Sequence, residues 1–520
     1  MMPQRPLTSP SRALSTGLAA ASWLALGTLL LGTPGCAQEP FLGPYKHVLL
    51  ISLDTTRADH LGCYGNLTAS TPHLDALAAE GTLFNDVVAT ATTTLSSHTS
   101  IMTGLYPRRH GVARNGFMVN QENRMLAEVL SGAGFHTAGF LGSYALDRMF
   151  DFNQGFDAWD QEFDIEFSFL HADQNQRRGE DVTDAVLDHL DELDGDERLF
   201  LFAHYFDAHA PYDPPAPFGA RFVPEGQPVT SNIREISLQE ALHHQRSEGQ
   251  QHSVYDLGLT RSMAAFTSDD PLPGDRLLAS LYAAEIAYMD GAIGRLLAGL
   301  DKRGLLEDCV VMVIADHGET FWEHGDAWHH GAWVFDTNVR VPLILRLPDG
   351  RGAGKQVTGL ASGTDVFPTL LELLDIDLPE EVDGISLMAA LDGAPLPERA
   401  VFSEATQPVL GVEQAGRWLG QFKPRAVRRG PWKYIEAPYI EVAQLFNLRS
   451  DPFERHNLLL HPSPRSQVEL PILKQALDAW SAHETPRPSR FNTTQADEVR
   501  QRLEALGYTG KDKSGAAEDD

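Results

Sequence analysis

Residues 47–54 of this chain read HVLLISLD, and this stretch decides the fold. An apolar run without polar alternation is typical of a parallel strand that is buried on both faces of a sheet. A second run of the same kind, CVVMVIAD, spans residues 309–316. The two runs end in Asp54 and Asp316. Because sites in open α/β sheets lie at the carboxyl ends of the strands, we expect both acids to border one site.

Strand and helix patterns alternate along most of the chain. TPHLDALAAEG at residues 71–81 predicts a helix with a proline in its first turn, and residues 275–304 predict a long amphipathic helix. RLFLFAHY at residues 198–205 predicts another strand. After about residue 400 the patterns become short strands separated by turns. We therefore predict an α/β fold: a doubly wound, mostly parallel sheet flanked by helices, with a small C-terminal antiparallel-sheet subdomain.

The N-terminus has the features of an export signal. Arg5 and Arg12 precede an apolar segment at residues 18–32, which is too short for a spanning helix and typical of a secretory signal. Cys36 follows a small residue, as in a bacterial lipobox. We expect an exported bacterial protein, either periplasmic or anchored to the outer membrane by a lipid on Cys36. Cleavage near Ala37, which would leave a soluble periplasmic protein, is the alternative.

The composition narrows the possible partners. Apolar residues make up 42% of the chain and charged residues 22%, which is typical of a globular protein. The net charge of −30 opposes binding to nucleic acid, so we expect no nucleic-acid partner. If Cys36 carries a lipid, Cys63 and Cys309 are the remaining cysteines, and we expect both to be buried without a disulfide.

Two strand ends and one polar segment predict a metal site. Asp316 is followed at once by His317, so that one strand end supplies a carboxylate and an imidazole, while Asp54 supplies a second carboxylate. Mixed oxygen and nitrogen ligands suit a divalent ion. Between the two runs, TTTLSSHTSIMTGLYPRRHG at residues 92–111 is rich in hydroxyl groups. A hydroxyl beside a bound cation can become a nucleophile.

Several ordered motifs resemble the sulfatase family of the alkaline phosphatase superfamily. They are LDTTRADHLGCYG, TPHLDALAAEG, SIMTGLYPRRHGV, ADHGETFWEHG, RVPLIL and LFNLRSDPFERHNL. This resemblance implies an alkaline-phosphatase-like sheet and a hydrolase that acts on sulfuric or phosphoric ester bonds. It also implies one divalent metal ion held by Asp54, Asp316, His317 and the nucleophile.

The chain departs from the family at the nucleophile. Sulfatases usually carry C-x-P-x-R, whose cysteine is oxidised to formylglycine; here these positions are Thr94, Ser96 and His98. Threonine cannot form that aldehyde. We therefore predict that Thr94 itself is the nucleophile and a metal ligand, with Ser96 and Ser97 as rivals that the spacing disfavours. Thr55 replaces the second acid of the usual Asp pair, which leaves calcium, manganese and zinc open.

The resemblance also implies imidazole groups around the transferring group. Three histidines match motif positions: His98, His209 and His330. We expect His98 and His330 to neutralise charge on the transferring group, and His209 or His330 to protonate the leaving oxygen. His324 is a weaker candidate. Arg57 either joins the site or pairs structurally with Asp59.

Three functions remain open at this point. The first is a phospho-ester hydrolase or transferase that uses Thr94, because a threonine sulfate lacks the elimination route that releases sulfate from formylglycine. The second is a true sulfuric ester hydrolase without formylglycine. The third is an inert, lipid-anchored protein that binds anionic glycans. The substrate is an anionic ester: a glycan, a lipid headgroup or a small molecule.

The patterns divide the chain into four parts. We expect residues 1–36 to form the signal segment with its lipobox. We expect residues 46–400 to form the sulfatase-like catalytic domain, with a polar insertion at residues 213–275 near the active site. Residues 401–480 are predicted to form the C-terminal subdomain, and residues 481–520 a last helix and a disordered tail.

Overall fold

The structure is a computed structural model, and it describes a defined part of the chain. The described residues are 44–163, 176–223, 225, 273–321, 323–324, 330–405, 423–438, 441–482, 487 and 490–491. The predicted signal segment, Cys36, most of the predicted insertion and the last predicted helix lie outside the described residues. So does most of the predicted tail.

The main sheet has nine strands in the order β10-β2-β9-β7-β1-β6-β4-β5, with β8 paired to β2. The strands are β1 (His47–Leu53), β2 (Thr82–Val88), β4 (Phe135–Phe140), β5 (Ala158–Asp160), β6 (Arg198–Tyr205), β7 (Cys309–Ala315), β8 (Arg340–Val341), β9 (Leu343–Arg346) and β10 (Lys355–Ser362). β9 runs antiparallel to β2 and β7, and β8 runs antiparallel to β2. The other pairings are parallel, which confirms the predicted fold class.

The two runs that predicted the sheet are neighbours in its centre. β1 and β7 pair in parallel, and all residues of both strands are buried. This explains why neither run alternates apolar and polar residues. The last pair in the register joins Leu53 to Ala315. Asp54 and Asp316, the residues that follow, therefore leave the sheet at the same level.

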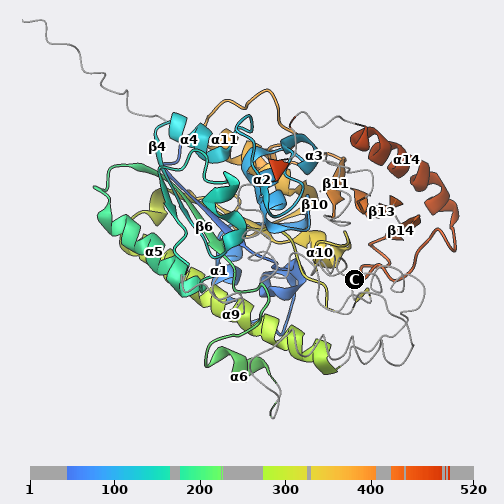
Figure 1. Cartoon of the computed structure of the whole chain (residues 1–520), viewed down its shortest axis with the longest axis horizontal. Coiled ribbons are helices and arrows are strands. Elements are labelled where there is room, and N and C mark those ends of the chain that lie inside the picture. Colours follow the sequence, from blue (N-terminus) through green and yellow to red (C-terminus); the bar gives the residue numbers. More distant parts are fainter. Residues whose placement is uncertain are drawn as a thin grey trace, which may run out of the picture. The chain divides into compact units, whose positions relative to one another are not determined.

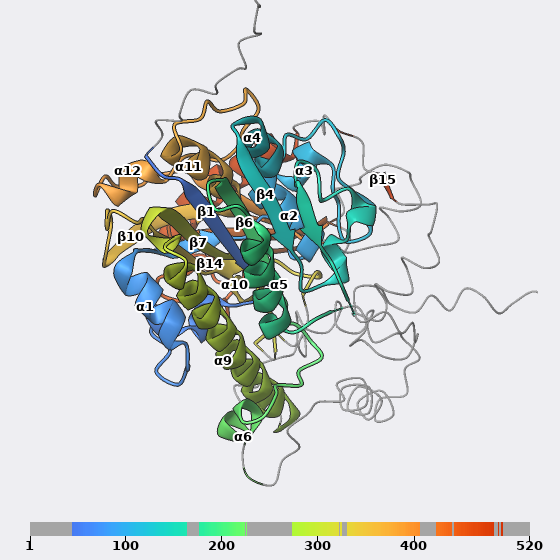
Figure 2. The ribbon, with the colours of Figure 1, turned by 90° about the vertical axis from the view of Figure 1, so that its left-hand side faces the viewer.

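Helices cover both faces of the sheet (Figures 1 and 2). One face carries α1 (Pro72–Glu80), α5 (Gly179–Glu192) and α9 (Pro273–Lys302), and the other carries α2 (Thr94–Thr103), α4 (Leu126–Gly132) and α11 (Val366–Leu373). The short helices are α3 (Pro107–His110), α6 (Phe218–Phe222), α10 (Asp336–Val339) and α12 (Met388–Leu391). β3 (Phe117–Met118) pairs with β15 (Arg490–Phe491). Within the described residues, no helix combines the length and the apolar character that crossing a membrane requires.

A second, antiparallel sheet follows near the C-terminus. It has the order β11 (Ala400–Glu404), β12 (Arg425–Arg429), β13 (Trp432–Ala437) and β14 (Val442–Asn447). The helix α14 (Pro464–Ser481) packs on it through Leu473 and Leu477, which share an apolar cluster with Trp432. The side chain of Lys433 ties this sheet to α10, because its Nζ lies 2.6 Å from Oδ1 of Asp336.

Candidate active site

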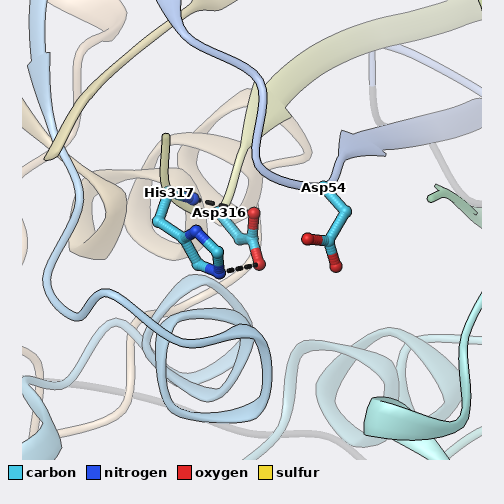
Figure 3. Close-up of side chains that lie close together, drawn as sticks. All are labelled: Asp54, Asp316 and His317. Carbon is cyan, nitrogen blue, oxygen red and sulfur yellow. Dashed lines mark hydrogen bonds and ion pairs between the residues drawn. The ribbon is translucent and has the colours of Figure 1, made fainter. Parts of the chain in front are cut away.

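Asp54, Asp316 and His317 converge beyond the ends of β1 and β7. All three are buried, and one ligand atom from each lies within 4.8 Å of the others. Figure 3 shows the two carboxylates and the ring of His317 gathered together. The structure thus brings together the three side chains that the sequence predicted as metal ligands.

The polar atoms of this cluster fit a cation. Asp54 Oδ1, Asp316 Oδ2 and His317 Nε2 are buried, and none has a hydrogen-bond partner among the described residues, although His317 Nε2 and Asp316 Oδ2 lie 3.3 Å apart. Buried polar atoms of this kind are costly unless something binds them. Two carboxylate oxygens and one imidazole nitrogen are ligands for a divalent ion. The residues present therefore fit the metal ion that the sequence predicts.

The pKa values of the three side chains are shifted in the direction expected for buried carboxylates close to each other. Burial raises the pKa of Asp54 to about 7, although His317 and a hydrogen bond with the Thr94 side chain oppose the rise. Burial also raises the pKa of Asp316, and the charge of Asp54 adds to that effect. For His317, burial lowers the pKa but the two carboxylates outweigh it, so that the pKa is raised. A bound cation would allow both carboxylates to stay ionised.

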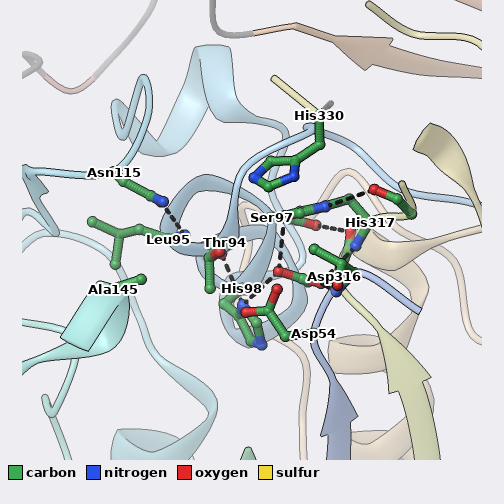
Figure 4. A network of polar contacts seen from close by, with 12 residues as sticks. Asp54, Thr94, Leu95, Ser97, His98, Asn115, Ala145, Asp316, His317 and His330 are labelled. Atoms are coloured by element: carbon green, nitrogen blue, oxygen red, sulfur yellow. Dashed lines mark hydrogen bonds and ion pairs between the residues drawn. The ribbon is translucent and has the colours of Figure 1, made fainter. Parts of the chain in front are cut away.

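Thr94 is the first residue of α2 and is fully buried. Its side chain hydrogen-bonds with that of Asp54, which places the hydroxyl beside the proposed metal ligands. The rival hydroxyls are tied to main-chain carbonyls: Ser96 Oγ donates to Val112 O at 2.7 Å, and Ser97 Oγ donates to Asp316 O at 2.7 Å. Of these three side chains, Thr94 is the one that hydrogen-bonds with a carboxylate of the cluster. Figure 4 shows Thr94 and Ser97 close to Asp54 and Asp316.

The ring of His98 lies between the first turn of α2 and β1, next to the cluster. Its Nδ1 lies 2.8 Å from Thr94 O, and its Nε2 lies 2.7 Å from Ser52 Oγ. Nδ1 is also 3.5 Å from Asp316 Oδ2. Both ring nitrogens are therefore engaged within the protein, beneath the cluster. The expected contact of His98 with the transferring group stays a prediction, and the structure adds a contact that holds the main chain of Thr94.

His209 and His330 lie together at the cluster. Their ring centroids are 5.0 Å apart, and the ring of His330 is 4.6 Å from that of His317. His330 Nδ1 lies 3.2 Å from both carboxylate oxygens of Glu319. His209 Nδ1 donates to Ala210 O at 2.6 Å, and burial, followed by the neighbouring His330, lowers the pKa of His209 to about 3. The Nδ1 of His330 therefore faces a carboxylate, whereas the Nδ1 of His209 faces a main-chain carbonyl.

Arg57 and His324 have structural partners. The Arg57 guanidinium binds both carboxylate oxygens of Asp59, at 2.9 and 2.8 Å, and Glu323 Oε1 at 2.6 Å. This confirms the pairing with Asp59 that the sequence left as an alternative. The ring of His324 stacks on Phe335 at 3.7 Å. Burial lowers the pKa of His324 to about 3, so it is a neutral packing group.

Sequence reasoning missed three residues at the site. His204 Nε2 lies 3.0 Å from Asp54 Oδ2. Asn115 Oδ1 accepts from the main-chain N–H of Leu95 at 2.7 Å, and its Nδ2 is buried without a hydrogen-bond partner among the described residues. Glu319 contacts His330, as described above. One signal was present for His204: it lies near the end of a buried strand, where site residues gather.

Thr55 adopts a backbone conformation that is rare for its type. Its φ is 50°, in the left-handed region that β-branched residues avoid. This turn directs the Thr55 N–H to Asp316 Oδ1 at 3.1 Å, and Thr55 O accepts from the hydroxyl of Tyr282 at 2.7 Å. Strain of this kind is held in place by its surroundings and is common at functional sites.

Comparison with known proteins agrees with the fold and the site. A family model described as Sulfatase matches residues 46–376, and one described as N-sulphoglucosamine sulphohydrolase, C-terminal, matches residues 322–480. N-acetylglucosamine-6-O-sulfatase of Bacteroides thetaiotaomicron is 22% identical, over 70% of this chain and 75% of that protein. The multifunctional alkaline phosphatase superfamily protein PehA of Trinickia caryophylli is 25% identical, over 80% of this chain and 92% of that protein.

The crystal structure of the phosphonate monoester hydrolase of Agrobacterium radiobacter has the same fold, with a TM-score of 0.62 at 23% identity, over 84% of this chain and 95% of that one. The fold, the site and the relatives together define a hydrolase that acts on sulfate or phosphate esters. The chain belongs to the sulfatase family of the alkaline phosphatase superfamily. Members of this family generally bind a divalent metal ion, and Asp54, Asp316 and His317 are the candidate ligands here.

Proposed function

We propose that this chain is a metal-dependent hydrolase of phospho-esters that uses the Thr94 hydroxyl as its nucleophile. The observation that carries the proposal is the hydrogen bond between the Thr94 side chain and Asp54, at the start of a buried helix. The nearby hydroxyls of Ser96 and Ser97 are committed to main-chain carbonyls. Thr94 is therefore the hydroxyl best placed to attack an ester bound at the cluster.

The choice of phosphorus over sulfur follows from the nucleophile. A formylglycine hydrate expels sulfate from its own carbon, which regenerates the aldehyde. A threonine ester has no such exit, and water must attack the transferred group a second time. Water can hydrolyse a phosphothreonine at phosphorus, where the site can neutralise the developing charge. This difference favours phospho-ester chemistry.

The proposed ligands of the ion are Asp54, Asp316, His317 and Thr94. When bound, the ion would supply Lewis-acid stabilisation and a lower pKa for a coordinated hydroxyl. His98 holds the main chain of Thr94 through its carbonyl. Asn115 offers its buried Nδ2 beside the N-terminus of α2, where N–H groups favour anions. Together these groups orient the ester and bind its non-bridging oxygens.

His330 is the better candidate for the general acid. The Glu319 carboxylate contacts its Nδ1, which orients the ring and stabilises a positive charge on it. His209 shares its Nδ1 proton with Ala210 O and has a pKa lowered to about 3, so it is neutral near pH 7. In the proposed reaction the Thr94 hydroxyl loses its proton to solvent, and its oxygen attacks phosphorus in line. The bond from phosphorus to the leaving oxygen breaks, and His330 protonates that oxygen. Water then attacks the phosphothreonine and breaks its bond to Thr94 oxygen, which takes up a proton from this water as phosphate leaves, and His330 regains its proton from solvent.

Turnover of matched esters tests the proposal. The full-length protein and Thr94→Ala would be assayed on p-nitrophenyl phosphate, a phosphate diester, a phosphonate monoester and p-nitrophenyl sulfate, with Zn, Mn or Ca. We expect phospho-ester turnover that the substitution abolishes. Sulfate turnover that depends on Thr94 would instead establish a sulfuric ester hydrolase without formylglycine. No detectable turnover of any of these esters would favour a binding protein for anionic glycans.

We further propose that the protein is exported and lipid-anchored at Cys36. The support is the charged and apolar pattern of residues 1–36, with its lipobox-like end. In a bacterial host, cell fractionation would place the protein with membranes and Cys36→Ser in the soluble periplasm. Identical fractionation of both forms would reject the anchor.

A further inference from the structure

Apart from contacts with Thr94 and His317, which are themselves proposed ligands, and a 3.5 Å contact of His98 Nδ1 with Asp316 Oδ2, each carboxylate of the candidate metal site has one oxygen that the protein hydrogen-bonds and one that it does not. Asp54 Oδ2 accepts from His204 Nε2 at 3.0 Å, whereas Oδ1 has no hydrogen-bond partner among the described residues. Asp316 Oδ1 accepts from the main-chain N–H groups of Thr55, at 3.1 Å, and His317, at 2.7 Å. Asp316 Oδ2, like Asp54 Oδ1, has no such partner there.

We propose that this hydrogen-bonding shell restricts Asp54 and Asp316 to one ligating oxygen each, so that the site selects zinc or a similar small transition-metal ion over calcium. His204 is the positioning residue that imposes this restriction on Asp54. The inference rests on the proposed function only in requiring that the site binds a metal ion.

The number of donor atoms is the physical reason. Calcium takes about six to eight oxygen ligands and often uses both oxygens of a carboxylate. Among the described residues, the donors at the cluster are two carboxylate oxygens, the Nε2 of His317 and the Thr94 hydroxyl. Zinc in catalytic sites takes three protein ligands and keeps a position open, and it accepts imidazole nitrogen. The donor set is therefore too small and too rich in nitrogen for calcium.

His204 is held rigidly enough to impose the restriction. It lies on β6 directly beside β1, where it pairs with Ser52 in the parallel register. Its ring is fully buried and lies edge-on to that of His98, at 5.0 Å between centroids. A neutral imidazole has one N–H, and the contact with Asp54 Oδ2 places it on Nε2. Partners that fix a ligand in this way tune both affinity and choice of metal.

The Asp316 carboxylate is held by main-chain N–H groups, so substituting a side chain cannot remove these hydrogen bonds. Its Oδ1 is bound by two N–H groups, one of them from Thr55 in its left-handed conformation. Substituting His204 therefore isolates one carboxylate. His204→Phe removes the donor but keeps a ring of similar size, whereas His204→Gln keeps an amide N–H that can reach the carboxylate.

The experiment measures metal binding rather than turnover. The full-length protein is stripped with a chelator, and the affinities for Zn²⁺, Mn²⁺ and Ca²⁺ are measured by competition with a metal indicator. For the wild-type protein we expect no displacement of Zn²⁺ by millimolar Ca²⁺. In His204→Phe we expect zinc affinity to fall about 10–100-fold and the preference over calcium to narrow, with recovery in His204→Gln.

His47→Gln is the matched control, because His47 is a buried histidine at the opposite end of β1. Its metal affinities should equal those of the wild-type protein. Unchanged zinc affinity in His204→Phe, or calcium bound as tightly as zinc by the wild-type protein, would overturn the inference. If His204→Phe does not fold, the visible spectrum of the Co²⁺-loaded wild-type protein decides. Strong absorption would indicate that four or five ligands bind Co²⁺, as the inference requires. Weak absorption would indicate six ligands and would contradict the inference.

The two proposals fail separately. A protein that keeps zinc selectivity but hydrolyses no phospho-ester retains this inference and loses the proposed function. A protein that turns over phospho-esters through Thr94 but prefers calcium loses this inference alone.

Discussion

The ring of His98 holds the main chain of Thr94 four residues before it, with 2.8 Å between His98 Nδ1 and Thr94 O. On its other side, His98 Nε2 lies 2.7 Å from Ser52 Oγ on β1. The imidazole thus connects the first turn of α2 to the strand that ends in Asp54. Burial lowers the pKa of His98 to about 3, so this connection is made by a neutral ring.

Replacing His98 by alanine should misplace the nucleophile. Thr94 O and Ser52 Oγ would both lose a buried partner, at a cost of about 2–4 kcal/mol of folding stability. Because small displacements of reacting groups are costly, we expect kcat to fall about 100-fold with little change in KM. Urea unfolding and steady-state kinetics measure the two effects. A rise in KM with unchanged kcat would instead indicate that His98 contacts the substrate directly, as the sequence suggested.

The three hydroxyls at the start of α2 should differ sharply in their effect on turnover. Thr94→Ala should lower kcat by about 1,000-fold or more, because it removes the attacking atom. Ser96→Ala and Ser97→Ala each lose one hydrogen bond to a carbonyl, worth about 1 kcal/mol of stability, and should keep kcat within a few-fold. Single-turnover assays on the three variants, beside their unfolding curves, make the comparison. A comparable loss of turnover in Ser97→Ala would contradict the assignment of Thr94.

Lys433 should contribute strongly to the folding stability, although it is distant in the sequence from the candidate active-site residues. Its Nζ lies 2.6 Å from Asp336 Oδ1 and 2.7 Å from Glu454 Oε1, and its side chain is buried. Lys433→Met would leave two acids without their cation, which should cost about 3–5 kcal/mol in urea unfolding. The exposed Lys302, changed in the same way, should alter stability by less than about 0.5 kcal/mol. Equal effects of the two substitutions would show that the ion pairs contribute nothing.

Stability should fall at mildly acidic pH, in part through His47. Burial lowers the pKa of His47 from 6.5 to about 4, and its Nδ1 accepts from the Leu199 N–H at 3.3 Å. Between these two pKa values the unfolded chain binds the proton that the folded protein excludes. Stability therefore decreases as pH drops from 6.5 toward 4, by at most about 3 kcal/mol from this group. Unfolding curves at pH 7 and pH 5 should show a smaller loss in His47→Gln, and an equal loss would refute the assignment.

The sequence alone determined the architecture of the main sheet and the positions of the candidate metal ligands. HVLLISLD and CVVMVIAD are apolar without alternation because both strands are buried on both faces. Such strands occupy the centre of a parallel sheet, and their carboxyl ends meet at one edge. Asp54, Asp316 and His317 could therefore be predicted from local patterns. The order of motifs further identified the family and predicted Thr94 as the nucleophile.

Only the tertiary structure decided how the polar side chains use their hydrogen bonds. His204 is separated from Asp54 by 150 positions and meets it because β6 lies beside β1. Arg57 is engaged by Asp59 and Glu323, and His98 by Ser52 and Thr94. Motif spacing identifies a residue's neighbours in the chain, but the partner of a buried donor depends on which acceptors the fold brings within about 3 Å of it. For the same reason, the oxygen that each carboxylate leaves for a metal ion follows from the packed fold rather than from the motif.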